Sequence, residues 1–288
     1  MKETRAEYLH IEKLRPFEGH PFKVIDNEEM EQLVWSILTQ GLLTPLVVRS
    51  LPSGEYEVVS GHRRLHACKK AGIETVPTLI TDMDRDTATI ALVDSNLHRE
   101  KILPSEKAYA YKMKAEALAH QGWRSDLTSG QVVPKSDDNR TTAQIGADVG
   151  DSYKTVQRYI RLTNLIPEIL QYVDEGRIAF TPAVELSYLN DQEQYDLWEQ
   201  MELNDCTPSL SQACRLKKIS QEEGLTPEVI VEIMSEEKAN QREMFKVPMD
   251  RIRKYVPSGR LHQAEDFVLK ACEYYHRYLL RQRDRDER

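Results

Sequence analysis

The residues best able to do chemistry stand at the start of one short helical segment. In VVSGHRRLHACKKAGI (residues 58–73) a β-type run ends at Gly61, and His62, Arg63 and Arg64 follow at once. The first turn of a helix presents backbone N–H groups that lack an intrahelical partner and attract anions. Two guanidinium groups beside such a turn make a candidate phosphate site. An arginine pair alone is also typical of a solvated helix start, so the interpretation depends on the neighbouring segments.

Two further stretches carry residues that could face the same site. GLLTPLVVR (residues 41–49) places Gly41 and Pro45 around a tight turn that leads into a strand. DSNLHRE (residues 94–100) ends a helical pattern with Asn96, His98 and Arg99 close together. The three stretches together favour a binding site over an isolated helix start.

The elements that must position these residues follow from the hydrophobic pattern. Apolar residues recur every three or four positions in some segments and alternate in others. Short turns, such as Pro52-Ser53-Gly54, separate them. We therefore expect helices over residues 26–41, 63–72, 85–98 and 105–120, and strands over residues 45–50, 55–61 and 76–81. Residues 11–100 would form a mixed α/β unit with short connections.

A second motif, TTAQIGADVGDSYKTVQRYIRLTNL, predicts a helix-turn-helix. Gly146 suits the point where two helices cross closely, Gly150 suits the turn, and Ser152 suits the cap of the second helix. The small core between them would comprise Ile145, Val149, Val156 and Ile160. An ordinary helical hairpin with a solvated face is the alternative. The outward face of the second helix would carry side chains suited to bases and phosphates, namely Ser152, Tyr153, Lys154, Gln157, Arg158 and Arg161.

Composition bounds the class of protein. The chain has 288 residues and a formal net charge of −8, which argues against a generally basic nucleic-acid coat but allows a locally positive face. Its four cysteines form no C-x-x-C pair, so a reducing cytoplasm is expected and zinc is not. No apolar run is long enough to span a membrane. The chain divides into an N-terminal domain (8–121), a linker (122–140), a helix-turn-helix domain (141–220) and a helical C-terminal domain (225–288) that could serve dimerisation.

In this order, the three stretches and the helix-turn-helix resemble the ParB/Spo0J/RepB family of partition proteins. That family shows a glycine–glutamine–proline turn, a Gly-Glu-Arg-Arg box, a Glu-Asn-Leu-Gln-Arg box and then a helix-turn-helix. The resemblance covers roughly residues 8–190. It implies an α+β N-terminal ParB/sulfiredoxin-like domain, an all-α helix-turn-helix domain and a helical C-terminal region.

The resemblance also implies ligands and partners. CTP with Mg²⁺ would bind the N-terminal domain, and a specific, palindromic double-stranded DNA site would bind the helix-turn-helix of a homodimer, which closes as a clamp. A ParA-type ATPase is an expected partner, with the segment before Leu14 as its candidate contact. The protein would lie in the cytoplasm on nucleoid or plasmid DNA. Carried over residue by residue, the nucleotide site would comprise Gly41, Thr44, Pro45, Gly61, His62, Arg63, Arg64, Asn96, His98 and Arg99, with Asn96 also near the metal.

The chain departs from the family pattern where catalysis is concerned. His62 and Ser95 replace the two glutamates of the boxes, and Thr44 and His98 replace glutamines. Carboxylates hold Mg²⁺ and orient water, so weak CTP hydrolysis and binding without turnover both remain open. Asp94 or Glu100 could take the missing role.

Other function classes share this fold. A sulfiredoxin-type enzyme needs a cysteine beside the phosphate-binding arginine, and position 62 is histidine. A kinase needs a carboxylate near Asn96, for which Glu100 is the candidate. Neither explains the helix-turn-helix. The stronger alternative is a transcriptional regulator that binds an operator and keeps the N-terminal domain as a scaffold.

Overall fold

The computed structural model describes residues 4–99, 101–129, 138–236, 251, 253, 255 and 264–286, and it divides the chain into two units, 1–236 and 237–288. No helix in the described ranges is both long and apolar enough to cross a membrane.

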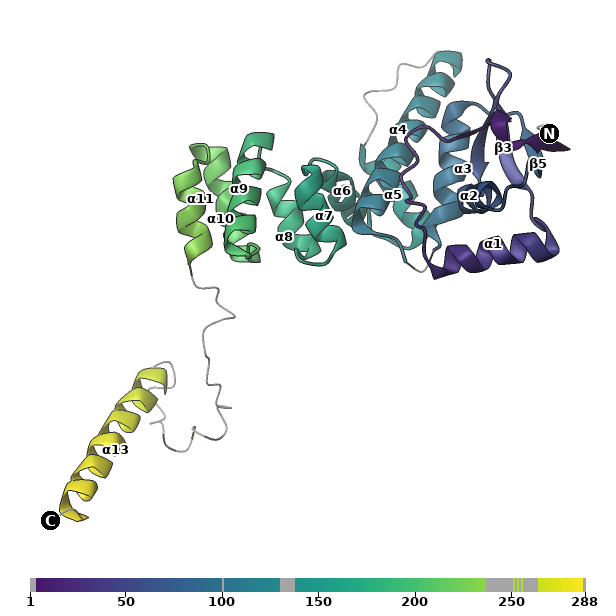
Figure 1. Ribbon diagram of the computed structural model, residues 1–288. Helices are drawn as coiled ribbons and strands as arrows, with labels where there is room; N and C mark the ends of the chain where they lie inside the picture. The colour runs from purple at the N-terminus through teal and green to yellow at the C-terminus, as the bar shows by residue number, and fades with distance from the viewer. Residues whose placement is uncertain are drawn as a thin grey trace. The chain divides into compact units, whose positions relative to one another are not determined.

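The first unit opens with a five-stranded sheet whose strand order is β1-β5-β3-β4-β2 (Figure 1). β1 pairs antiparallel with β5, β5 parallel with β3, β3 antiparallel with β4, and β4 parallel with β2. The strands are β1 (Thr4–His10), β2 (Leu14–Pro16), β3 (Leu46–Ser50), β4 (Tyr56–Ser60) and β5 (Thr75–Thr81).

Helices make up the rest of the described chain. The short 3-10 helix η1 (Ile11–Lys13) separates β1 from β2. The α-helices are α1 (Glu28–Gln40), α2 (His62–Lys70), α3 (Arg85–Leu97), α4 (Pro104–Ser129), α5 (Asp138–Val149), α6 (Tyr153–Leu162), α7 (Pro167–Asp174), α8 (Phe180–Leu186), α9 (Asp191–Asn204), α10 (Leu210–Glu222), α11 (Pro227–Ser235) and α13 (Ala264–Asp286).

Helices cover both faces of the sheet because its inner strands are apolar on both sides. Val58 and Val59 are adjacent in β4 and both buried, yet they join different hydrophobic clusters. The Val58 cluster contains residues of α1 and α2, whereas the Val59 cluster contains residues of α3 and α4. This two-faced burial is typical of strands inside a layered α/β arrangement.

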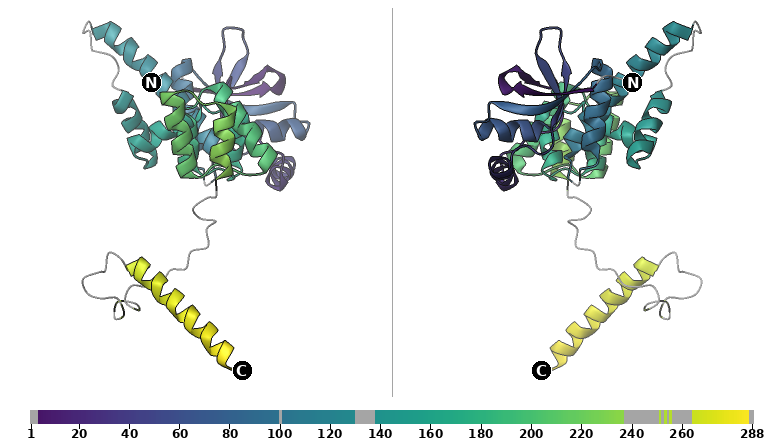
Figure 2. Two further views of the ribbon diagram at one scale, coloured as in Figure 1. Left: turned by 90° about the vertical axis from the view of Figure 1, so that its left-hand side faces the viewer. Right: turned by 90° about the vertical axis from the view of Figure 1, so that its right-hand side faces the viewer.

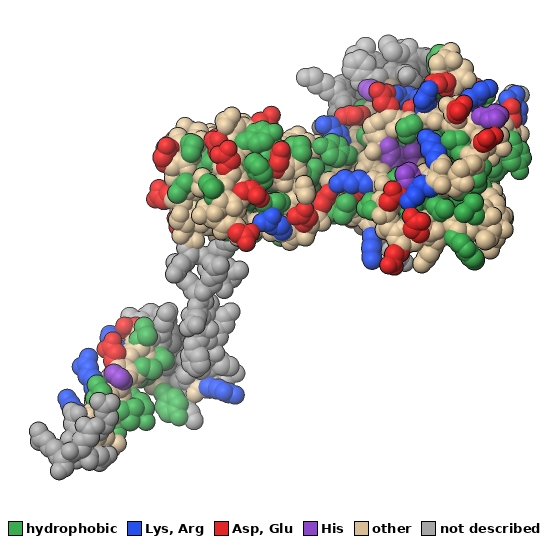
Figure 3. Space-filling view, in the orientation of Figure 1, with side chains coloured by type: hydrophobic (Ala, Val, Ile, Leu, Met, Phe, Trp, Pro, Cys, Tyr) green, Lys and Arg blue, Asp and Glu red, His purple; other side chains and the backbone are tan. Residues whose placement is uncertain are grey.

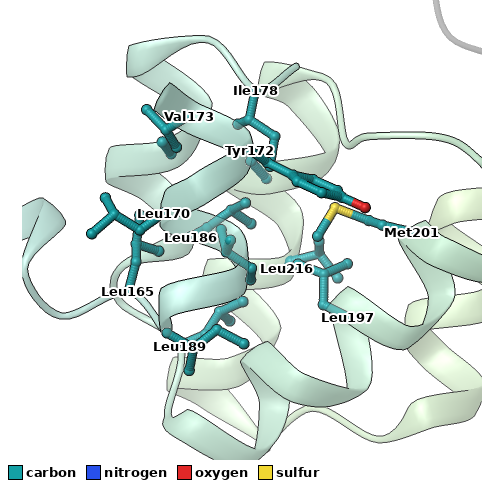
Figure 4. Packing of buried hydrophobic residues seen from close by; sticks show 14 of the residues in the cluster. Leu165, Leu170, Tyr172, Val173, Ile178, Leu186, Leu189, Leu197, Met201 and Leu216 are labelled. Atoms are coloured by element: carbon teal, nitrogen blue, oxygen red, sulfur yellow. The ribbon is translucent and has the colours of Figure 1, made fainter. Parts of the chain in front are cut away.

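The Val59 cluster also contains Ile145 of α5 and Val156 of α6. The helix-turn-helix therefore shares a core with the α/β region. The following helices, α7 to α11, pack around a separate cluster that includes Leu186, Leu197 and Leu216 (Figure 4).

The structure changes two of the expected boundaries. α4 continues to Ser129, so the first part of the expected linker (122–140) is helical, and its end extends beyond the rest of the unit (Figure 2). Residues 122–129 contain no proline to stop the helix, and their glycine is a tolerable cost. α11 lies in the first unit rather than with the C-terminal region, because its Ile230 and Ile233 are buried in the α7–α11 cluster.

Strand β1 was absent from the sequence expectation. Only Leu9 of its seven residues is buried, so the segment lacks the alternation that marks a half-buried strand. Its place at the edge of the sheet explains this pattern, because the strand is held by main-chain pairing with β5.

Candidate functional site

Gly61 creates the turn at which β4 gives way to α2. It has a φ of 102°, and a Cβ atom there would lie 2.6 Å from Cδ2 of Leu46 and 3.1 Å from Nη2 of Arg64. Only glycine fits both the left-handed backbone and the close approach. Because the N-cap has no side chain, it leaves the N–H groups of the first turn of α2 available to an anion.

The two arginines of this turn have different surroundings. Arg64 points inward, and its Nη1 donates hydrogen bonds to the carbonyl oxygens of Thr44, at 2.5 Å, and Pro45, at 2.9 Å. Arg63 is partly exposed and contacts the exposed carboxylate of Glu29 at 3.2 Å. Arg64 therefore ties the 41–45 turn to α2, while Arg63 keeps its charge near the surface.

The side chain of His62 makes its contacts inside the protein. Its side chain is buried, its Nε2 accepts a hydrogen bond from the N–H of Phe17 at 3.3 Å, and its ring lies 3.8 Å from that of His20. Burial, then the charges of His20 and Arg99, lower the pKa of His62 to about 3. The imidazole is thus neutral near pH 7, and what it offers a phosphate is its backbone N–H.

The end of α3 reaches the same place. Arg99 lies over the ring of Phe22 at 5.4 Å, and burial and the nearby charge of Arg63 lower the pKa of Arg99. Two guanidinium groups, one on α2 and one just after α3, therefore lie close enough for their charges to interact. Figure 3 shows Lys, Arg and His side chains gathered on part of the surface of the first unit. Close cations without a full set of counter-charges favour an anionic ligand.

The remaining predicted residues are placed as follows. Gly41 caps α1 with a φ of 74° and is exposed, as is Thr44. His98 is exposed at the C-cap of α3. Asn96 is buried, and its Nδ2 donates to the carbonyl oxygen of Leu92 at 2.7 Å. The amide nitrogen of Asn96 therefore serves the helix, and its carbonyl oxygen is the atom a cation would use.

Sequence reasoning missed the segment that covers these residues. Phe17, His20 and Phe22 each contact a site residue or lie directly beside one. The one signal in the sequence was the density of rings in FEGHPF, and nothing in that pattern indicates what the rings touch.

The described residues offer no cage for a metal ion. Among them, no group of three His, Cys, Asp or Glu side chains could hold one. Asp94, a candidate substitute for the missing glutamates, is paired with Nζ of Lys114 at 2.6 Å. Glu100, the other candidate, lies outside the described residues.

The helix-turn-helix has the predicted geometry. A Cβ on Gly146 would meet the carbonyl oxygen of Asp151 at 2.4 Å, and Gly150 has a φ of 79°. Oγ of Ser152 accepts a hydrogen bond from the N–H of Thr155 at 3.1 Å and so caps α6. Of the expected core, Ile145 and Val156 are fully buried, whereas Val149 and Ile160 are partly buried against the same cluster.

Its second helix exposes fewer of the expected side chains. Tyr153 and Lys154 are exposed, whereas Gln157 is half-buried. Arg158 lies over the ring of Phe180 at 4.8 Å and donates to Thr181 at 3.0 Å. Arg161 is half-buried and lies over the ring of Tyr188, which follows α8, at 3.3 Å. A DNA contact by Arg161 stays a prediction, and the pattern within α6 does not reveal that the segment after α8 covers part of this side chain.

The positive surface of this region is local. Residues 138–236 hold eight Lys and Arg against eighteen Asp and Glu. Acidic side chains therefore outnumber basic ones more than two to one in this region.

The first unit thus joins a five-stranded α/β domain, which carries an arginine-flanked glycine turn, to a helix-turn-helix through a shared core, and this combination defines its class of protein. The family models for the ParB N-terminal domain and the ParB HTH domain match residues 1–97 and 136–208. The chromosome-partitioning protein Spo0J of Thermus thermophilus is 34% identical over 212 residues, which cover 73% of this chain and 69% of that protein. The probable chromosome-partitioning protein ParB of Vibrio cholerae is 27% identical over 272 residues, 91% of this chain and 85% of that protein. A solved Pnob8-like ParB-N domain has 19% identity and a TM-score of 0.47, over 82% of this chain and 99% of that chain.

The chain belongs to the ParB/Spo0J family of chromosome-partitioning proteins. The expected fold class is thereby confirmed: an α+β N-terminal domain of ParB type is followed by an all-α helix-turn-helix region.

Proposed function

We propose that this protein is a sequence-specific DNA-binding partition protein of a chromosome, plasmid or mobile element, and that its N-terminal domain binds CTP to close a clamp on DNA. One observation carries the proposal. The free first turn of α2, Arg63 and Arg99 converge from separate segments, in the same compact unit as the helix-turn-helix. Family membership supplies the identity of the ligands.

The residues present fit a nucleotide. The N–H groups at the start of α2, with Arg63 and Arg99, would bind the phosphates, and the exposed turn at Gly41 and Thr44 would contact the base. Arg64 would act indirectly, by fixing that turn through its carbonyl bonds. The bound triphosphate would supply negative charge that relieves the repulsion between the two exposed arginines.

The fit to Mg²⁺ is poorer. Asn96 would contribute one carbonyl oxygen, and phosphate oxygens and water would complete the shell, as is common for this ion. Because His62 and Ser95 bring no carboxylate to the site, we propose CTP binding with slow hydrolysis or none.

A purified-protein titration tests the nucleotide site. CTP and the other nucleoside triphosphates are titrated with and without genomic DNA fragments. Arg63→Ala should weaken CTP binding at least tenfold, because it removes half of the exposed guanidinium pair. Lys69→Ala, at the other end of α2, is the matched control. Unchanged CTP affinity in Arg63→Ala would place the site elsewhere.

DNA binding is proposed for the start of α6. Lys154→Ala should reduce DNA affinity and the steepness of its salt dependence, because one phosphate contact is lost. Arg158→Ala should also reduce affinity, in part by disturbing Phe180. Lys218→Ala on α10 is the control, since Lys218 is exposed and pairs with Glu222.

We propose that the protein acts as a homodimer through α13, on nucleoid or plasmid DNA, with a ParA-type ATPase as partner. α13 carries apolar side chains that are exposed in the single chain and share one face of the helix, among them Tyr275, Tyr278 and Leu279. A second copy of the chain would cover them. Light scattering of Leu279→Asp, which should dissociate the dimer, tests this contact.

A DNA-binding regulator that ignores nucleotide is the second candidate, and one observation favours it. Two of the four residues in the 61–64 box, His62 and Arg64, use their side chains in hydrogen bonds within the protein. Absence of nucleotide binding in every arm of the titration, with DNA binding intact, would select this candidate.

A further inference from the structure

One face of α4 holds the turn of the helix-turn-helix. Lys107, Tyr111 and Lys114 are spaced four and three residues apart and so lie on the same side of the helix. Nζ of Lys107 lies 2.8 Å from Oδ2 of Asp151, and the hydroxyl of Tyr111 donates to the same oxygen at 2.6 Å. Lys114 binds Asp148, at the end of α5. The two aspartates before and after Gly150 are thus both held by α4.

Lys114 differs from the other two because it joins three helices. Its side chain is 1% exposed, and its Nζ lies 2.6 Å from Oδ1 of Asp94 on α3 and 2.6 Å from Oδ2 of Asp148 on α5. Burial lowers the pKa of Lys114, but the hydrogen bonds and charges of Asp148 and Asp94 outweigh it and leave the pKa raised. The ammonium group is therefore charged at neutral pH and depends on these two carboxylates.

The two carboxylates lie next to the two proposed binding sites. Asp94 precedes Asn96 by two residues and Arg99 by five, at the end of α3 that reaches the nucleotide site. Asp148 precedes the Gly150 turn by two residues, and α6 begins at Tyr153. A helix moves as a rigid element over such short distances, so a shift of either site displaces its aspartate.

We propose that Lys114 is a positioning residue that couples the nucleotide site to the helix-turn-helix, by sharing one buried cation between Asp94 and Asp148. The inference rests on the proposed function. It adds the residue through which the two sites affect one another.

The physical basis is competition between equal partners. Asp94 is 47% and Asp148 48% exposed, and both bonds measure 2.6 Å, so neither carboxylate is clearly preferred. If α3 moves when the nucleotide binds, Lys114 must either follow Asp94 and strain its bond to Asp148 or release Asp94 to water. A buried ammonium cannot lose both partners. The position of α3 therefore affects how strongly Lys114 binds Asp148 of α5.

The chain supplies its own control. Among the described residues, the bonds that the Asp151 carboxylate makes go to Lys107 and Tyr111, both on α4. Tyr111→Phe removes one of these bonds and keeps the ring in the core. It should loosen the helix-turn-helix without cutting the link to α3.

Hydrogen–deuterium exchange of the full-length protein, with CTP added, tests the proposal without knowledge of the DNA target. In the unmodified chain, CTP should slow exchange at the start of α2 and also change exchange in residues 141–162 by about fivefold or more, the lower end of common coupling factors. Asp94→Asn should keep the first effect and lose most of the second. Lys114→Met should do the same, since it leaves two half-exposed carboxylates that water can solvate. Tyr111→Phe should retain both effects, although its basal exchange in residues 141–162 is faster.

The outcomes separate this inference from the proposed function. If CTP protects α2 but leaves residues 141–162 unchanged, or if Asp94→Asn transmits the effect as well as the unmodified chain, coupling through Lys114 is refuted and the nucleotide site stands. If CTP protects neither region, the nucleotide site itself is refuted, and the coupling falls with it. Because Asp94 is half-exposed, its asparagine variant should fold even if Lys114→Met does not.

Discussion

We expect Gly146→Ala to lower the free energy of unfolding, although replacing a glycine by alanine within a helix usually raises it. Alanine within a helix is normally more stable than glycine by about 1 kcal/mol, because glycine has more backbone freedom to lose. At position 146 the added methyl would lie 2.4 Å from the backbone oxygen of Asp151, where ordinary contact begins at 3.4 Å. α5 and the turn must therefore separate by about 1 Å.

The turn resists that separation. The N–H of Asp151 bonds to the carbonyl oxygen of Gly146 at 2.9 Å, and the Asp151 carboxylate is held by Lys107 and Tyr111 of α4. Forcing an extra methyl into a packed site costs about 1–3 kcal/mol. Subtracting the propensity gain of about 1 kcal/mol leaves a net loss of stability of up to about 2 kcal/mol.

Urea unfolding followed by circular dichroism measures this loss. Ala147→Gly, at the exposed neighbouring position of α5, reports the propensity term alone and should also destabilise, by about 1 kcal/mol. Gly146→Ala should in addition weaken DNA binding, because α6 is displaced from α5. A variant that unfolds at a higher urea concentration than the unmodified chain would refute the reasoning, since the close helix crossing would then not exist in solution.

Three further predictions concern the N-terminal region. Because the pKa of His62 is lowered from 6.5 to about 3, chiefly by burial and then by His20 and Arg99, the unfolded chain binds more protons below pH 6.5. The free energy of unfolding should fall as the pH drops from about 6.5 towards 3, by up to about 1.4 kcal/mol per pH unit, and His62→Gln should flatten that slope in urea titrations at several pH values. Asp174→Ala removes the acceptor of two hydrogen bonds from Ser105 at the start of α4, at 2.9 and 2.6 Å, and should cost about 1–2 kcal/mol in thermal unfolding, whereas the exposed Glu175 tolerates alanine. Arg64→Met should cost about 2 kcal/mol and speed amide exchange in the 41–45 turn, because two carbonyl oxygens lose a charged donor; unchanged exchange there would show that the turn stands without Arg64.

The short-range features were predictable because their causes are local. A glycine with positive φ, a serine cap and a close helix crossing depend on residues within a few positions of one another. Gly150 and Ser152 could therefore be assigned from spacing alone, and the structure confirms both. The sheet strands β3, β4 and β5 were equally visible in their apolar runs.

The character of the site depended on contacts between distant parts of the chain. The sequence predicts that His62 and Arg64 bind phosphate. In the structure, the His62 ring instead accepts a hydrogen bond from the N–H of Phe17, 45 residues away, and Arg64 donates to the carbonyl oxygens of the 44–45 turn. The sequence predicts a base or phosphate contact for Arg161, yet Tyr188, two residues after the end of α8, lies beneath it. No local pattern encodes such partners.

The sequence by itself determined the family, the order of the elements and the turns that need glycine, because these depend on residue type and short spacing. Only the tertiary structure decided which charged groups stay near the surface and which form hydrogen bonds or ion pairs inside the protein. Lys114 shows why: within α4 it is one lysine among several, and its burial between Asp94 and Asp148 exists only because three helices pack together and exclude water from that point.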